Sequence, residues 1–96
     1  MKDNGYRDSI VQAEEECYIC HRQGALARHE PLDGLGRRQK SKELGLWVRL
    51  CPPHHDMSHR DRELQDMLRG DCQRAAMRAY GWTVEKFIEE FGKNYL

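Results

Sequence analysis

The sequence predicts a small α+β domain in which two short strands precede several helices and a zinc ion holds the chain together. Two pairs of metal-ligating residue types enclose a stretch with turn and strand signals, and apolar residues recur at helical spacing after the second pair. The chain has 96 residues, is 39% hydrophobic and has a mean hydropathy of −0.93. This composition is lean for a self-sufficient core, so a metal ion that adds folding free energy fits the length.

The charge balance excludes a globally basic nucleic-acid coat protein. Sixteen Lys and Arg residues balance sixteen Asp and Glu residues, so any nucleic-acid surface must be local. No apolar run approaches the roughly 20 residues of a membrane span, and the first residues lack the apolar segment of a secretory signal. We therefore expect a soluble cytoplasmic protein in which the four cysteines bind metal rather than form disulfides.

The chain divides into a lead-in and one domain. Residues 1–16 are polar and end in three glutamates, and we expect them to be weakly ordered or to form a short helix. Residues 17–96 contain no linker-like stretch and form the single domain.

The first half of the domain alternates turns with extended segments. Residues 17–24 have the pattern of a tight metal-binding turn, and residues 25–31 follow as an extended segment. Gly34 and Gly36 require a turn, after which residues 37–42 are expected to be an exposed basic loop. Residues 46–50 combine aromatic and β-branched side chains in a short strand that ends at two prolines.

The second half is helical. Residues 54–80 are expected to form one or two helices, with Gly70 as a candidate break and Gly81 as the end. Thr83 is a good N-cap for a last helix that carries its apolar residues on one face.

The two ligand pairs favour a structural zinc site. Cys17 and Cys20 form one pair, Cys51 and His54 form the other, and both pairs have the short spacing of tetrahedral zinc sites. A different ligand set, with His21 in place of His54, remains open. A redox-active pair of cysteines would be expected in a βαβ context, which the sequence does not show. Cys72 has no partner at chelating distance and is expected to be a small buried apolar residue.

A second group of histidines follows the zinc ligands. His55 and His59 are four residues apart, which places them on the same face of a helix, whereas His54 and His55 point about 100° apart. His54 is therefore expected to complete the zinc site, while His55 and His59 bind a separate ion together with His29. Alternatively, these histidines are solvated surface residues.

These motifs resemble the HNH, or His-Me finger, endonucleases in their zinc-containing form, most closely the small phage-borne members. The resemblance covers roughly residues 17–96. It rests on the two Cys/His pairs, on His29-Glu30, on His55 and His59, and on three further stretches: 34–41, 45–51 and 80–96. It implies a ββα-metal fold, in which two strands and a helix surround one divalent ion, with additional C-terminal helices.

The resemblance also implies roles for individual residues. His29, His55 and His59 fall on the positions of metal-binding histidines, and Glu30 falls on the position of the general base, so that His29, Glu30 and His55 are the candidate catalytic residues. Two positions differ from the family pattern: Glu30 replaces a histidine, and Leu46 replaces the middle asparagine. Glu30 as a metal ligand and His29 as the base are therefore alternatives.

The chemistry implied is metal-dependent hydrolysis of a phosphodiester in DNA, with Mg²⁺ or Mn²⁺ as the catalytic ion beside the structural zinc. The resemblance further implies a phage or prophage origin, action in the host-cell cytoplasm, and phage packaging proteins as partners. Basic residues near the site could contact backbone phosphates, although a solvated loop explains them equally well: Arg28, Arg37, Arg38, Lys40 and Lys42. Two other functions remain open: a zinc module that binds DNA or protein without cleaving, and a metal-binding adaptor or inhibitor.

Overall fold

A computed structural model describes residues 5–34 and 36–96. It confirms the α+β class: a two-stranded antiparallel sheet is followed by helices, and a cysteine–histidine cluster lies where β2 meets α2. The elements in chain order are β1 (Ala27–His29), α1 (Arg37–Leu44), β2 (Val48–Leu50), α2 (Pro52–Arg60), α3 (Arg62–Tyr80) and α4 (Val84–Phe91).

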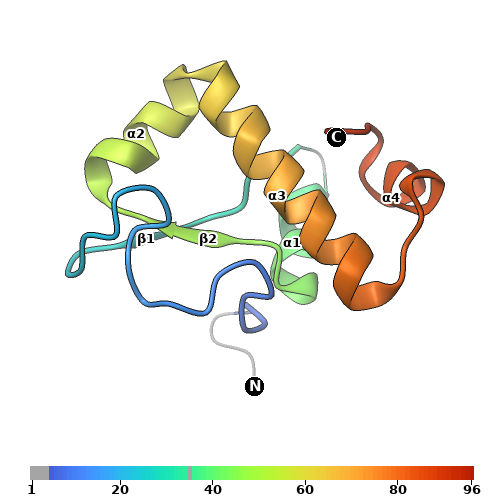
Figure 1. Cartoon of the computed structure of the whole chain (residues 1–96), viewed down its shortest axis with the longest axis horizontal. Helices are drawn as coiled ribbons and strands as arrows, with labels where there is room; N and C mark the ends of the chain where they lie inside the picture. The colour runs from blue at the N-terminus through green and yellow to red at the C-terminus, as the bar shows by residue number, and fades with distance from the viewer. Residues whose placement is uncertain (1–4, 35) are drawn as a thin grey trace.

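The sheet fixes the register of the residues that matter for the site. Ala27 pairs with Leu50 and His29 pairs with Val48, so His29 stands at the end of β1. β2 runs directly into α2 through Cys51, and the two prolines Pro52 and Pro53 occupy the first helical positions, where a missing N–H costs nothing. The zinc-ligand pair and the helical histidines therefore follow immediately after the strand that pairs with β1 (Figure 1).

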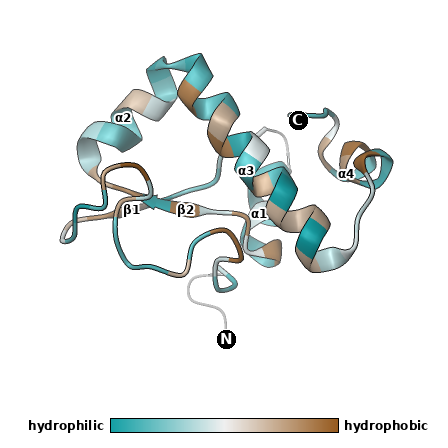
Figure 2. Cartoon of the chain, viewed as in Figure 1, coloured by the Kyte–Doolittle hydropathy of each residue, from teal (hydrophilic) through white to brown (hydrophobic). Residues whose placement is uncertain are grey.

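The long helix α3 joins two small cores. It crosses the molecule from α2 to the connection with α4 (Figure 1). Its Leu68 packs with Cys17, Val48 and Cys51 beside the sheet. One turn further on, α3 contributes to a second core, whose buried members are Leu32, Leu46, Cys72, Ala76, Phe87 and Phe91. Cys72 is fully buried there, as the sequence predicts, and the apolar side of α4 forms the other wall (Figure 2).

The expected basic loop is wrong: residues 37–44 form the helix α1. The residues Arg, Gln, Lys, Glu and Leu that compose it all favour helix, and charge rather than propensity suggested a loop. Gly34 and Gly36 have φ angles of 110° and 77°, which turn the chain before the helix begins. Ser41 is buried in α1 and donates a hydrogen bond to the Leu32 carbonyl at 3.0 Å, which anchors the helix to the segment after β1.

The candidate helix break at Gly70 is also wrong, because α3 is continuous from Arg62 to Tyr80. The break lies at Asp61, whose extended backbone separates α2 from α3 and whose side chain accepts from the Leu64 N–H at 3.1 Å. Gly70 instead makes room for the C-terminal tail: a Cβ atom there would lie 3.2 Å from the Tyr95 carbonyl oxygen. The final helix is as predicted, with Thr83 as its N-cap and Gly92 after its end.

The described part of the lead-in, residues 5–16, contains no helix and runs along α1 and β2 (Figure 1). Ser9 donates to the Trp47 carbonyl at 2.6 Å, the Trp47 indole N–H donates to the Arg7 carbonyl at 2.7 Å, and the Ile10 N–H donates to the Gly45 carbonyl at 2.9 Å. Gln12 is 5% exposed and its side-chain oxygen accepts from the Arg49 N–H. Residues 1–4, for which the same expectation was made, lie outside the described residues.

Replacing Gly45 with alanine is expected to destabilise the domain more than replacing Gly81. Both glycines follow the end of a helix and have a positive φ, 76° and 66°. An alanine at either position therefore loses the same free energy, about 1–2 kcal/mol, by adopting a left-handed backbone conformation. Only at Gly45 would the new Cβ collide with a neighbour, the Asp8 carbonyl, whereas Gly81 has open space. We expect an additional loss of about 1–3 kcal/mol for Gly45→Ala in urea unfolding. Equal losses for the two variants would mean that the lead-in does not pack against Gly45.

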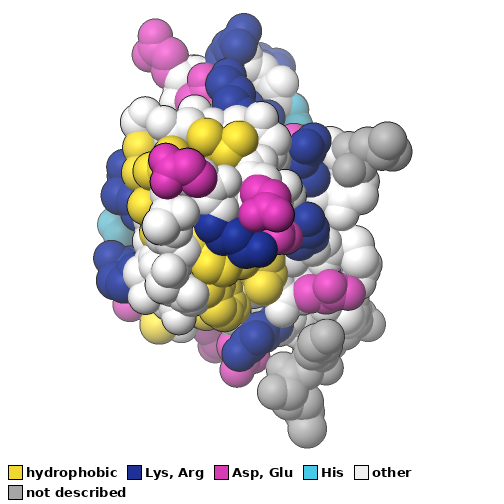
Figure 3. Space-filling model, turned by 90° about the vertical axis from the view of Figure 1, so that its right-hand side faces the viewer, with side chains coloured by type: hydrophobic (Ala, Val, Ile, Leu, Met, Phe, Trp, Pro, Cys, Tyr) yellow, Lys and Arg dark blue, Asp and Glu magenta, His cyan; other side chains and the backbone are white. Residues whose placement is uncertain are grey.

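No helix within the described residues combines the length and the apolar character needed to cross a membrane. The face on the side of α4 carries acidic and basic side chains interspersed around exposed apolar atoms, in keeping with a net charge of zero (Figure 3).

Candidate metal centres

The first centre brings together the four residues that the sequence predicts as zinc ligands: Cys17, Cys20, Cys51 and His54. Cys17 and Cys20 lie on a turn before β1, which the His21 N–H closes by donating to the Cys17 carbonyl at 2.9 Å. The Tyr18 N–H donates to the Arg49 carbonyl at 2.8 Å and so ties this turn to β2. Cys51 and His54 lie at the start of α2, so two segments that are distant in the sequence converge on one point.

The distances between the donor atoms fit a tetrahedral zinc ion. Zn–S bonds of about 2.3 Å and Zn–N bonds of about 2.0 Å give edges of about 3.8 Å between sulfurs and about 3.5 Å between sulfur and nitrogen. The Cys20 and Cys51 sulfurs are 3.7 Å apart, and the His54 Nδ1 atom lies 3.6 Å from the Cys17 sulfur and 3.3 Å from the Cys51 sulfur. The cluster is therefore consistent with a structural zinc site.

The surroundings of Cys17 also suit a metal ligand. Burial opposes ionisation of its thiol, but backbone hydrogen bonds from Cys20 and Cys51 outweigh it and lower the pKa of Cys17 to about 6. The thiolate form, which binds zinc, is thus favoured at neutral pH. His21, the alternative ligand, lies on the surface and its Nδ1 atom contacts the Glu16 carboxylate instead.

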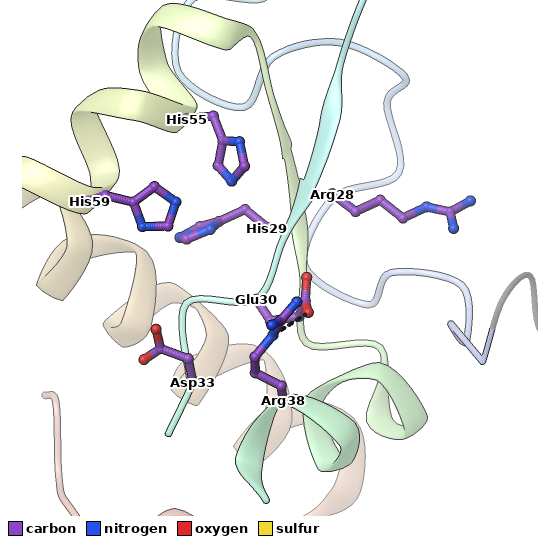
Figure 4. Close-up of a pocket in the computed structure, with 7 residues that line it drawn as sticks. All are labelled: Arg28, His29, Glu30, Asp33, Arg38, His55 and His59. Atoms are coloured by element: carbon purple, nitrogen blue, oxygen red, sulfur yellow. Dashed lines mark hydrogen bonds and ion pairs between the residues drawn. The ribbon is translucent and has the colours of Figure 1, made fainter. Parts of the chain in front are cut away.

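The second centre is formed by three histidines from two elements. His29 comes from β1, and His55 and His59 point toward it from adjacent turns of α2 (Figure 4). One nitrogen from each ring lies within 4.8 Å of the other two, and the ring centroids are 4.9–5.5 Å apart. Three imidazoles at this separation can converge on one divalent ion with little movement.

The environment of His29 and His55 favours their neutral form, which is the form that binds metal. Burial and the neighbouring His55 and His59 rings lower the pKa of His29, and burial followed by His59 lowers the pKa of His55. His29 is 4% exposed, and its Nε2 atom lies 2.8 Å from the Gln65 side-chain oxygen. His59, in contrast, is exposed, so the cluster opens to solvent on one side.

A pocket of about 290 Å³ opens beside the histidines. Its walls include Arg28, Glu30, Asp33 and Arg38 (Figure 4). Glu30 follows His29 in the chain and its carboxylate turns toward Arg38, away from the three rings, as alternation along an extended segment requires.

Glu30 is a buried carboxylate with two donors. Its side chain is only 2% exposed, and it accepts from the Tyr6 hydroxyl at 2.8 Å and from the Arg38 Nε atom at 3.2 Å. Burial and the bond to Glu30 raise the pKa of Tyr6 to about 12, so the hydroxyl keeps its proton at neutral pH. The lead-in therefore reaches the site through Tyr6.

The five basic residues expected near the site separate into groups. Arg28 and Arg38 line the pocket, although Arg28 extends away from the histidines and lies over the Tyr6 ring (Figure 4). Lys42 also lies over the Tyr6 ring, at 4.7 Å from its centroid. Lys40 pairs with Glu90 at 3.0 Å and lies over the Phe91 ring, and the Arg37 guanidinium approaches Gly92, so these two side chains face α4.

Two residues in contact with the site, Tyr6 and Gln65, could not be predicted from local sequence patterns. Tyr6 lies in a segment expected to be weakly ordered, and Gln65 lies in a helix where a polar residue is ordinarily solvated. Neither carries a spacing signal toward His29 or Glu30, because both contacts depend on how distant segments pack. The spacing of His55 and His59, in contrast, was sufficient to identify them.

All the potential ligands of both metal centres are side chains of this one chain. Within residues 51–59, Cys51 and His54 belong to the cysteine-rich group and His55 and His59 belong to the histidine group, and the histidine group faces a pocket. No family model matches the chain, and no curated protein or solved structure is significantly similar to it.

Proposed function

We propose that this protein is a metal-dependent DNA endonuclease of the HNH type, with a structural zinc ion at the cysteine-rich cluster. The observation that carries the proposal is the group His29, His55 and His59, which opens onto a pocket lined by Arg28, Arg38 and Glu30. Convergent imidazoles suit a divalent ion, and the Arg38 guanidinium in the same pocket suits a phosphate. The two arginines of the pocket balance the carboxylates of Glu30 and Asp33, so a divalent ion at the histidines would give the pocket the positive charge that favours a phosphodiester substrate over an uncharged one.

An Mg²⁺ or Mn²⁺ ion held by His29, His55 and His59 would stabilise the negative charge that develops on the phosphate and the leaving oxygen. Glu30 is assigned to accept the proton of the attacking water, whose oxygen forms the new bond to phosphorus as the bond to the leaving sugar oxygen breaks. Arg38, which already pairs with Glu30, would face the phosphate across the same pocket and oppose its charge.

The proposed place of action also follows from the sequence resemblance. A phage or prophage origin would put the enzyme in the host-cell cytoplasm, with phage packaging proteins as its partners. Co-purification of the tagged protein from infected cells with the packaging machinery would support this part of the proposal, which is independent of the cleavage chemistry.

The test is cleavage of supercoiled plasmid in Mg²⁺, Mn²⁺ and Ni²⁺. The wild type is expected to nick the plasmid, EDTA is expected to stop it, and His55→Ala is expected to lower the rate by at least about 100-fold because an ion ligand is lost. His21→Ala is the matched control, since His21 is an exposed histidine that lies outside both metal-ligand groups. The proposal is wrong if the wild type binds the ion at the histidines but cleaves neither plasmid nor single-stranded DNA.

One observation favours a second function, a zinc module that binds DNA or a protein without cutting. The only carboxylate adjacent to His29 in the chain, Glu30, is already occupied by Tyr6 and Arg38 and turns away from the histidines. This candidate predicts binding of duplex DNA at low salt with no cleavage by the wild type, and nicking once Glu30→His introduces a better base at that position.

A further inference from the structure

Gln65 makes a contact that bears on the chemistry of His29. It lies in the first turns of α3 and is 7% exposed. Its side-chain oxygen is 2.8 Å from the His29 Nε2 atom, and its side-chain nitrogen donates to the Pro31 carbonyl at 3.0 Å. The Arg69 Nε atom donates to the same carbonyl at 3.0 Å, so the Pro31 oxygen is held between two donors.

These contacts determine which way the amide faces. A backbone carbonyl can only accept, so the NH₂ end of Gln65 must face Pro31 and the oxygen end must face His29. The reversed amide would place two acceptors against each other in a buried site, which costs free energy. No buried side-chain polar atom among the described residues lacks a partner, so the arrangement is fully satisfied.

The same argument determines which ring nitrogen of His29 carries the proton. Because the Gln65 oxygen can only accept, the Nε2 atom of His29 must donate, and a neutral imidazole with a proton on Nε2 has its lone pair on Nδ1. A histidine that binds metal through one nitrogen ordinarily donates from the other to a fixed acceptor, which sets the tautomer and the ring orientation.

We propose that Gln65 is a positioning residue that holds His29 in the Nε2–H tautomer, so that Nδ1 is the nitrogen offered to the divalent ion. This inference rests on the proposed function only in assigning His29 to an ion. It adds that the ligand atom is chosen by α3, a helix that contributes no ligand itself, through a hydrogen bond between segments 36 residues apart.

The direct test is the tautomer of His29, measured by long-range ¹H–¹⁵N NMR on the zinc-loaded protein before any second ion is added. The wild type is expected to show the Nε2–H form. Gln65→Met, which keeps the side-chain length but removes the acceptor, is expected to give a mixture of both tautomers. Gln65→Glu loses the bond to the Pro31 carbonyl, which Arg69 still satisfies, but keeps an acceptor for Nε2–H, so it is expected to retain the Nε2–H form. An Nδ1–H tautomer in the wild type would overturn the proposal even if the variants do not fold.

The second readout is the affinity of the histidine site for Ni²⁺, measured by calorimetry with elemental analysis to show that zinc is retained. Gln65→Met is expected to weaken Ni²⁺ binding by about 10–100-fold, and Gln65→Glu is expected to recover most of it. Gln73→Met is the matched control, because Gln73 is also a buried glutamine of α3 but bonds to Asn94 and Tyr95. Unchanged Ni²⁺ affinity in Gln65→Met would contradict the proposal.

The two proposals fail separately. If the wild type does not cleave DNA but shows the Nε2–H tautomer and a Gln65-dependent Ni²⁺ affinity, the metal site stands and only the nuclease assignment is lost. If it cleaves DNA with an Nδ1–H tautomer at His29, the nuclease assignment stands and Gln65 has only a packing role.

Discussion

Cys51→Ser is expected to leave the protein unfolded, as is removal of zinc by a strong chelator. Cys51 lies between β2 and α2, as the N-cap of α2, and is 1% exposed, so its sulfur lies where the sheet, the turn of Cys17 and Cys20, and the helix meet. Structural zinc sites contribute apparent binding free energies of about 10–16 kcal/mol in small domains, which matches or exceeds the total stability of about 5–15 kcal/mol of a typical domain. The expected result is loss of the far-ultraviolet helical signal and of dispersed NMR resonances.

The control for this prediction is Cys72→Ala. Cys72 is also fully buried, but it lies in the other core, beside Ala76 and Phe87, and outside the metal-ligand groups. Removing its sulfur is expected to cost about 1 kcal/mol through lost packing, with one zinc ion per chain retained. Less than about half an equivalent of zinc in wild-type protein purified without chelator would contradict the structural role of the metal.

The zinc prediction bears on the histidine site as well. His54 belongs to the zinc cluster and His55 to the histidine cluster, and adjacent residues of a helix point about 100° apart. A zinc ion bound to His54 therefore fixes the orientation of α2 about its own axis. This orientation directs His55 and His59 toward His29. The two centres share one short helix, so loss of the first is expected to disperse the second.

The parts of the fold that could be predicted from the sequence are those with a local signal. The spacing of the cysteine pairs, the proline-terminated strand and the Thr83 cap each depend on a few neighbouring residues, and each is confirmed. The helix α1 was missed because four positive charges in residues 37–42 look solvated, although Lys40 packs against Glu90 and Phe91 of α4. The break at Asp61 was missed because Gly70 looked the weaker position, and the tail that needs a glycine there is distant in sequence.

In the candidate site too, the residues with a local sequence signal could be predicted and those without one could not. Helical periodicity was enough to separate His54 from His55 and to pair His55 with His59, and a strand position was enough to add His29. Spacing cannot reveal which carboxylate is buried or what holds it. The bonds of Tyr6 to Glu30 and of Gln65 to His29 link residues 24 and 36 positions apart, so they arise only from tertiary packing.

Glu30→Gln is expected to abolish most of the cleavage while leaving the protein folded and able to bind DNA. The amide has the shape of the carboxylate, and its oxygen can still accept from the Arg38 Nε atom while its NH₂ group donates to the Tyr6 hydroxyl oxygen, so the packing around this buried side chain changes little. The amide cannot take up the proton of an attacking water. A general base contributes about 10²–10⁴-fold to the rate, and a loss in this range is expected in single-turnover cleavage with Mn²⁺.

Tyr6→Phe distinguishes the role of the carboxylate from the role of its surroundings. This variant removes one hydrogen bond to Glu30 but keeps the proton acceptor, so cleavage is expected to fall far less than in Glu30→Gln. Ni²⁺ affinity at the histidines is expected to be unchanged in both variants, because the Glu30 carboxylate lies outside the three-histidine group. Wild-type cleavage by Glu30→Gln would move the base to His29, whereas a loss of Ni²⁺ binding in Glu30→Gln would make Glu30 a metal ligand.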